Sequence, residues 1–153
     1  MMADVLAKFK EVFVKKKEKN IACFVDGPNI LRKELGIDLD SVRKALSKYG
    51  RVKIAKVFLD QYASDKLIEA VTNQGFDVVI VPSDVDVAMA VDAVESAYND
   101  TVDIIAIVSR DSDFRPVLAK AKARGLDTIV LGSEPDFSSA LKNSADVVID
   151  LRK

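Results

Sequence analysis

The stretch VDIIAIVSRDSDF, residues 102–114, decides the fold because a run of apolar residues passes directly into an acidic segment. A nearly continuous apolar run of this length is typical of a central parallel strand, which is buried on both faces of its sheet. Two carboxylates, Asp111 and Asp113, follow the run. We therefore expect a buried strand that ends beside a group of acidic side chains.

Other strand-like runs alternate with amphipathic segments on both sides of this stretch. They cover Ile21–Val25, Arg51–Leu59, Phe76–Val81, Asp127–Leu131 and Val147–Ile149. Asp or Ser residues mark the expected helix starts, Gly75 and Gly125 mark helix ends, and Pro116 falls in a first helical turn. Short connections between alternating strands and helices predict an α/β fold, a Rossmann-like doubly wound, mostly parallel sheet of five to six strands.

The first 20 residues differ in character from the remainder. Val5, Leu6, Phe9, Val12 and Phe13 recur at helical spacing, and six lysines against three acidic residues give this segment a charge of +3. We expect an N-terminal amphipathic basic helix and connector over 1–20, followed by one domain over 21–153. The helix is expected to pack on the domain or on a second copy, which would make a homodimer; a nucleic-acid arm or a membrane-surface helix are the alternatives.

Composition excludes several classes of chemistry. The 153 residues are 49% apolar and 31% charged, as in a globular protein, and no apolar run approaches the ~20 residues that span a bilayer. No signal-peptide pattern opens the sequence, so we expect a cytoplasmic protein that does not associate with a membrane. The chain has no histidine and one cysteine, so hydrolysis here must use carboxylates, lysines, hydroxyls or a metal-bound water.

Acidic residues follow three of the expected strands. Asp26 comes directly after the first, Asp84 and Asp86 follow the third, and Asp111 follows the fourth. In a doubly wound sheet the first and fourth strands are neighbours where the strand order reverses, and ligands bind at that edge. Carboxylates gathered there repel one another unless a cation lies among them, and Mg²⁺ or Mn²⁺ prefers such oxygen ligands.

Each acidic segment also has an ordinary explanation. Residues 26–29 contain turn-forming Gly, Pro and Asn, and the other acids suit helix N-caps. A cap needs one residue, whereas these acids come in pairs, which favours a binding site. Asp60, after the second strand, is a further edge carboxylate with less support.

Three segments together resemble the signature segments of the NYN domain, a family of the wider PIN-like nuclease group that includes LabA-like proteins. They are VDGPNI at 25–30, VDVAMAVDA at 85–93 and VSRDSDF at 108–114. The resemblance covers about residues 21–151 and implies a PIN-like sheet with an Mg²⁺- or Mn²⁺-dependent ribonuclease site. By position it implies catalytic roles for Asp26, Asn29, Asp86, Asp92, Asp111 and Asp113. The implied metal ligands among them are Asp26, Asp92, Asp111 and Asp113.

The chain departs from the family pattern twice. Ser83-Asp84 stands where many relatives have Lys-Gly, and Arg110 stands where many have Gly. Arg110 would either grip a phosphate or neutralise the acidic cluster. The residues expected to bind substrate are Asn29, Arg32, Ser109, Arg110 and Arg115. Lys120, Lys122 and Arg124 are expected to be solvated surface.

The leading hypothesis is a metal-dependent endoribonuclease acting on RNA. The alternative is a non-catalytic module that binds RNA, a nucleotide or a protein on the same fold. A phosphotransfer enzyme built on Asp84 and Asp86 ranks lower, because its Asp-x-Asp motif belongs after the first strand. A Toprim-like site would need a glutamate where this chain has Asp26.

Overall fold

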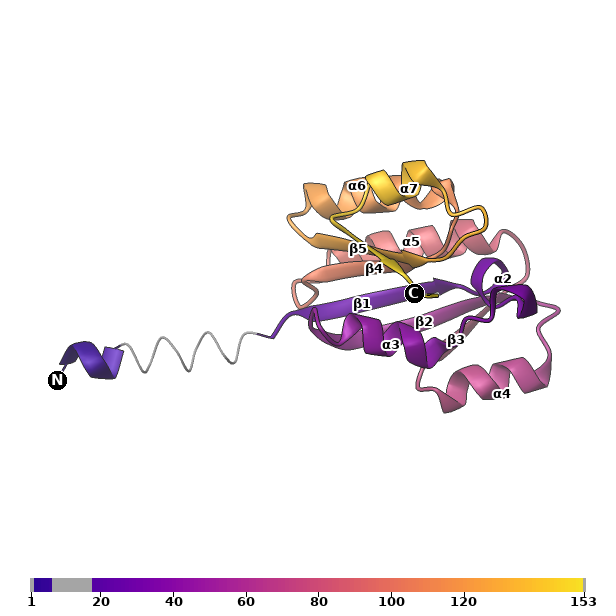
Figure 1. Ribbon diagram of the computed structural model, residues 1–153, viewed down its shortest axis with the longest axis horizontal. Helices are drawn as coiled ribbons and strands as arrows, with labels where there is room; N and C mark the ends of the chain where they lie inside the picture. Colours follow the sequence, from indigo (N-terminus) through magenta and orange to yellow (C-terminus); the bar gives the residue numbers. More distant parts are fainter. Residues whose placement is uncertain (1, 7–17, 153) are drawn as a thin grey trace.

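The protein forms one six-stranded sheet in which all strands are parallel, with the order β3-β2-β1-β4-β5-β6 (Figure 1). The computed structural model describes residues 2–6 and 18–152. The strands are β1 (Asn20–Asp26), β2 (Arg51–Asp60), β3 (Asp77–Val81), β4 (Ile104–Val108), β5 (Asp127–Gly132) and β6 (Val147–Asp150). The prediction of a Rossmann-like doubly wound α/β fold is confirmed.

Helices cover both faces of this sheet. They are α2 (Gly27–Ile30), α3 (Leu39–Leu46), α4 (Asp65–Asn73), α5 (Val85–Ala97), α6 (Arg115–Ala123) and α7 (Ser139–Asn143), with 3₁₀ turns η1 (Lys33–Leu35) and η2 (Ser112–Phe114). Figure 1 shows α3 and α4 on one face and α5, α6 and α7 on the other. Each face has its own apolar core, because successive residues of a strand point to opposite sides.

Strand β1 shows this alternation clearly. Ile21, Cys23 and Val25 join the core beneath α3 and α4, whereas Ala22 and Phe24 join the core beneath α5 and α6. Burial raises the pKa of the Cys23 thiol to about 12, so this cysteine stays protonated in the core. The strand is therefore fixed from both sides up to Asp26, its last residue.

Helix boundaries follow the expected local signals. Asp38 and Ser64 each accept a hydrogen bond from the backbone N–H three residues on, which caps α3 and α4. Gly75 and Gly125 end their helices with φ of 85° and 82°, a conformation that other residues rarely adopt. Residues 27–30, where a turn was the ordinary interpretation, instead form the short helix α2 with Pro28 in its first turn.

Residues 2–6 are helical, and the remainder of the predicted N-terminal helix, 7–17, lies outside the described residues. The division of the chain at residue 20 and a homodimer through this segment therefore stay predictions. Within the described ranges, no helix combines the length and apolar character that crossing a membrane requires.

Candidate functional site

The candidate site lies where the strand order reverses, between β1 and β4. These strands pair in parallel, with Val25 opposite Val108, so Asp26 and Ser109 leave the sheet side by side. The prediction that the first and fourth strands are neighbours is confirmed. The carboxyl edge at this switch point is the usual ligand position in a doubly wound sheet.

Ser109 joins the first and third acidic segments. Its fully buried hydroxyl donates a hydrogen bond to Asp26 Oδ2 at 3.0 Å and accepts one from the backbone N–H of Asp111 at 3.1 Å. A Cβ at Gly132 would lie 3.0 Å from the Ser109 carbonyl oxygen, so the absent side chain lets β5 approach closely. The serine therefore orients a carboxylate from inside the fold.

Close packing also positions α2 at this edge. A Cβ at Gly27 would lie 2.5 Å from the backbone oxygen of Phe58 in β2. Only glycine permits this approach, because the obstacle is backbone that cannot rotate away. The helix therefore places Asn29 beside a pocket of about 290 Å³ that Asp26 also lines, and Arg32, two residues after the helix, borders the same pocket.

Three carboxylates form a compact group next to Asp26. One oxygen each from Asp86, Asp111 and Asp113 lies within 4.8 Å of the others. Asp86 belongs to the first turn of α5, and Asp111 Oδ1 accepts the backbone N–H of Asp113 at 2.9 Å, which shapes the η2 turn. We call Asp86, Asp111 and Asp113 the acidic cluster.

Electrostatics at the site favour a bound cation. Burial, aided by the charges of Asp111 and Asp86, raises the pKa of Asp26 to about 6, while the hydrogen bond from Ser109 opposes this rise. The charge of Asp111, followed by burial and the charge of Asp86, raises the pKa of Asp113 above its ordinary value. A positive ion would remove this mutual repulsion.

The donor set fits a hard divalent cation. Every group in the acidic cluster is a carboxylate, and Mg²⁺ and Mn²⁺ are bound in proteins by such oxygens together with water. Ligand oxygens about 2.1 Å from one ion lie at most about 4.2 Å apart, so only a small closure of the 4.8 Å group is required. The cluster could hold the metal, with Asp26 at its buried side.

Asp92, an expected metal ligand, lies outside the acidic cluster. Its carboxylate pairs with Lys56 Nζ of β2 at 2.9 Å, and both side chains are mostly covered. Asp86, six residues earlier, contributes its carboxylate to the cluster instead. Asp84 is the exposed residue before α5 and does not join the cluster. Helix phase separates these aspartates, because six residues correspond to about 600° and leave Asp86 and Asp92 on different faces.

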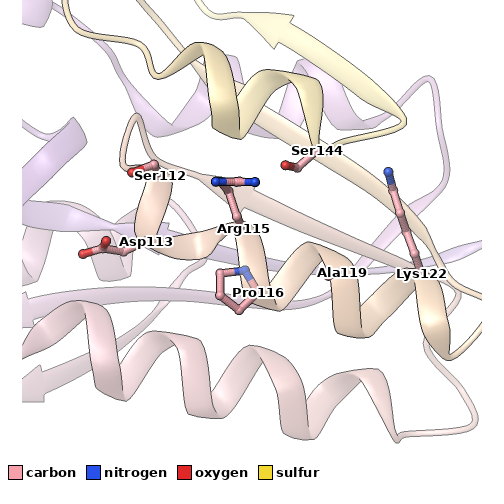
Figure 2. A pocket seen from close by; sticks show the side chains of 7 residues that line it. All are labelled: Ser112, Asp113, Arg115, Pro116, Ala119, Lys122 and Ser144. Carbon is pink, nitrogen blue, oxygen red and sulfur yellow. The ribbon is translucent and has the colours of Figure 1, made fainter.

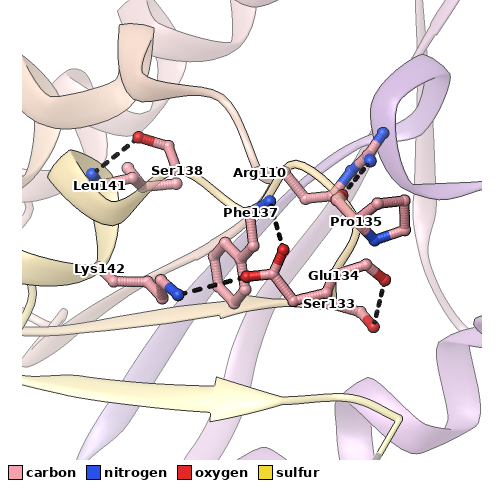
Figure 3. A network of polar contacts seen from close by, with 8 residues as sticks. All are labelled: Arg110, Ser133, Glu134, Pro135, Phe137, Ser138, Leu141 and Lys142. Atoms are coloured by element: carbon pink, nitrogen blue, oxygen red, sulfur yellow. Dashed lines mark hydrogen bonds and ion pairs between the residues drawn. The ribbon is translucent and has the colours of Figure 1, made fainter.

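The guanidinium of Arg110 donates hydrogen bonds to carbonyl oxygens of the protein itself. Nη1 donates to Pro135 O at 2.6 Å and Nη2 donates to Asn29 O at 2.9 Å. Figure 3 shows Arg110 reaching Pro135 in the segment between β5 and α7. Arg110 is only 7% exposed and ties α2 to this segment, while a role as phosphate grip or as counter-charge for the cluster stays a prediction.

The remaining expected substrate residues lie around the site. Asn29 Oδ1 accepts the backbone N–H of Arg110 at 2.9 Å, and the Asn29 side chain borders the pocket. Arg32 also borders it, with Nε donating to Pro28 O at 3.0 Å. Arg115 faces a separate groove beside α6.

Sequence reasoning gave little weight to Asp60, which borders the same pocket as Asp26. The signal was present, because Asp60 is the last residue of β2 and that strand pairs directly with β1. One oxygen of its carboxylate accepts the Tyr62 N–H at 2.9 Å, which explains the residue equally well as part of a turn.

A parallel sheet with a carboxylate cluster where the strand order reverses is the arrangement of an α/β domain that could bind a metal ion at that edge. The family model described as the NYN domain matches residues 20–152, and the chain belongs to this family. The NYN domain belongs to the PIN-like nucleases, which typically use divalent metals, and this chain has an acidic cluster that could hold one.

Two similar proteins have no assigned role. An uncharacterized protein of Methanocaldococcus jannaschii is 57% identical over 137 residues, which cover 90% of this chain and 57% of that protein. The chain therefore spans little more than half the length of this relative. A crystal structure of a protein of unknown function from Vibrio parahaemolyticus matches with a TM-score of 0.78 at 23% identity, covering 88% of this chain and 94% of that chain, and supports the fold alone.

Proposed function

We propose that the protein is a metal-dependent endoribonuclease that hydrolyses RNA phosphodiester bonds at the acidic cluster. The observation that carries this proposal is the convergence of Asp86, Asp111 and Asp113 beside the buried Asp26. These residues come from three separate segments, and the membership in a nuclease family gives their convergence a chemical meaning.

The acidic cluster would hold Mg²⁺ or Mn²⁺, which stabilises the charge that develops on the phosphate oxygens. Asp26, with a pKa of about 6, is suited to accept a proton from the attacking water near neutral pH. The Ser109 hydroxyl fixes the direction of that carboxylate. The oxygen of water then forms the new P–O bond as the bond to the leaving oxygen breaks. The leaving oxygen takes a proton from solvent water and Asp26 returns its proton to solvent, so the products are a phosphomonoester end and a free hydroxyl end.

Three parts of the site restrain its geometry. Asn29 in α2 and Arg32 just after it border the pocket, where a phosphate oxygen would meet the amide or the guanidinium. Arg110 holds α2 in place through the Asn29 carbonyl. Asp26 and Ser109 are buried, which limits the water that reaches them.

The test is cleavage of a labelled single-stranded RNA by the full chain with Mn²⁺ or Mg²⁺, with EDTA as the metal-free arm. Asp111→Asn should abolish cleavage while the protein stays folded. Asp77→Asn, an exposed aspartate at the start of β3, is the matched control and should cut at the normal rate. If the protein binds RNA but does not cleave it with any metal tested, the nuclease proposal is refuted and the protein is a non-catalytic binding module.

A further inference from the structure

An open groove of about 680 Å³ lies beside α6, with Ser144 at the end of α7 on its far wall (Figure 2). Asp113 lines the groove at the η2 end and belongs also to the acidic cluster. One end of the groove therefore borders the acidic cluster through Asp113.

The cations of α6 divide between two faces of the helix. Arg115, Ala119 and Lys122 line the groove, and their spacing of four and three residues places them on one helical face. Figure 2 shows Arg115 and Lys122 rising from α6 toward α7. Lys120 and Arg124 lie instead over the Tyr98 ring, at 5.8 Å and 4.4 Å from its centroid.

Both groove cations are available to an incoming anion. Arg115 is exposed and makes no ion pair within the part of the chain that the structure describes. Lys122 Nζ lies 3.8 Å from Asp146 Oδ1, beyond hydrogen-bond reach, and Asp146 Oδ2 already accepts Thr128 N at 2.9 Å. Lys122 therefore keeps its three donors for a closer partner.

The spacing of the two cations suits a nucleic-acid backbone. Seven residues of α-helix separate Arg115 from Lys122 by about 10 Å, or roughly three nucleotides of a stacked strand. Among residues 2–6 and 18–152, no aromatic side chain lines the groove to stack on bases. Its contacts with a strand would thus go to phosphates and carry no sequence preference.

We propose that this groove holds the phosphate backbone of the single-stranded RNA that flanks the scissile bond, with Arg115 and Lys122 as its phosphate contacts. The identity of the ligand as a substrate strand rests on the proposed nuclease function. Lys122, expected from sequence to be ordinary solvated surface, becomes a binding residue, whereas Lys120 and Arg124 serve packing against Tyr98.

The experiment measures the binding of a fluorescein-labelled, unstructured RNA of about 12 nucleotides to the full chain, in EDTA and across a salt series. At about 3.4 Å per nucleotide, this RNA is longer than the groove. Three forms of the protein are compared: the wild type, a groove variant and a control variant. The double variant Arg115→Gln/Lys122→Gln should bind on the order of tenfold more weakly or worse. The slope of log affinity against log salt should fall by about 1.4, since each single-strand phosphate contact contributes about 0.7. The matched control Lys120→Gln/Arg124→Gln should retain the wild-type slope.

Three outcomes would refute RNA binding in the groove. They are an unchanged slope in the groove variant, an equal loss of affinity in the control variant, and no measurable RNA binding by the wild type. Equal competition by polyglutamate would replace RNA with an acidic protein segment as the occupant. Cleavage with Mn²⁺ separates the two proposals. If the RNA stays uncut but its affinity depends on the groove residues, the nuclease proposal is refuted and the groove proposal stands. If the wild type cleaves RNA and the groove variant has an unchanged kcat/KM, only the groove proposal is refuted.

Discussion

At the scale of single residues, Asp26 shows how function opposes stability in this protein. The carboxyl is 5% exposed, and its pKa is raised to about 6 chiefly by burial. A carboxyl group in that position resists ionisation, yet the proposed roles in metal binding and in accepting a proton both require the ionised form. The site is therefore under electrostatic strain until a cation arrives.

The raised pKa of Asp26 determines whether this residue stabilises or destabilises the folded state as pH changes. The folded state binds this proton more tightly than the unfolded state, so the group's contribution to the free energy of unfolding falls as pH rises from about 4 through 6. A shift of about two units corresponds to about 3 kcal/mol at neutral pH. We expect Asp26→Asn, in EDTA at pH 7.5, to raise the free energy of unfolding by about 1–3 kcal/mol. In a separate assay with Mn²⁺, the same variant should not cleave RNA.

Urea denaturation at pH 7.5 and pH 4 measures this effect. The gain should shrink at pH 4, where the wild-type carboxyl is protonated, and Asp77→Asn should show no comparable pattern. If Asp26→Asn is less stable than the wild type at pH 7.5, the ionised Asp26 carboxylate does not destabilise the folded state.

Asp92 has a different role from Asp26 according to its contacts. Its ion pair with Lys56 connects α5 to β2, and the side chains are 24% and 30% exposed. Removing one partner of a buried pair costs about 3–5 kcal/mol, and the partial exposure here reduces the expected loss for Asp92→Asn to about 1–3 kcal/mol. Mn²⁺ affinity, measured by calorimetry, should stay at the wild-type value.

The Lys56→Gln/Asp92→Asn double variant is the control for this pair. It should recover part of the lost stability, because no unpaired charge is left under α5. Loss of Mn²⁺ binding in Asp92→Asn, with the fold intact, would return Asp92 to the metal ligands.

The sequence was sufficient to predict Asp26, Asp111 and Asp113 as neighbours, because strand ends in a doubly wound sheet meet by topology. It was insufficient to choose between Asp86 and Asp92, since that choice depends on where α5 begins and on Lys56 from another strand. The engagement of Arg110 with two carbonyl oxygens has no local signal either, because Pro135 lies 25 residues away.

At the scale of elements, the site depends on how α2 and the segment between β5 and α7 are held together. Arg110 donates to Asn29 O in α2 and to Pro135 O in that segment, and its backbone oxygen accepts the Ser138 N–H at 3.0 Å. The same segment is fastened further by Lys142, which contacts Glu134 at 3.4 Å (Figure 3). A buried arginine thus replaces the glycine expected from the family pattern and acts as a clamp.

Arg110→Gln should open this clamp. Loss of charge-assisted hydrogen bonds to buried carbonyls predicts a destabilisation of about 2–3 kcal/mol, and a displaced Asn29 should lower kcat. Urea denaturation and single-turnover cleavage report the two effects. Arg152→Gln is the control, since Arg152 contacts Glu134 O of the same segment from an exposed position and should change stability by no more than about 0.5 kcal/mol. A rise in Mn²⁺ affinity in Arg110→Gln would show instead that the arginine suppresses the cluster.

Element boundaries were largely predictable, and the reason is local chemistry. Asp38, Ser64, Gly75 and Gly125 act within a few residues of their own positions, so their signals are complete in the sequence. The division of the α6 lysines between a groove and Tyr98 was not predictable. It depends on the angle at which α5 and α7 pack against α6, which no local pattern encodes.

At the scale of the whole molecule, a metal at the acidic cluster would connect two segments that are separate in sequence. Asp86 lies in the first turn of α5, and Asp111 and Asp113 precede α6, so an ion would fasten both helices to the edge of the sheet. A ligand that binds only the folded state at 100 times its Kd stabilises that state by about 2.7 kcal/mol. For a domain of this size we expect Mn²⁺ to raise Tm by about 5–11 °C.

The pH dependence of that shift follows from the raised pKa values of Asp26 and Asp113. Protons compete with the metal for these carboxylates at low pH, so the Mn²⁺-induced rise in Tm should be smaller at pH 5.5 than at pH 7.5. Asp86→Asn and Asp113→Asn should reduce the shift at both pH values, whereas Asp77→Asn and Asp92→Asn should retain it. Thermal unfolding without RNA reports metal binding independently of turnover, so a shift that persists in Asp86→Asn but disappears in Asp92→Asn would relocate the metal to the Lys56 side of α5.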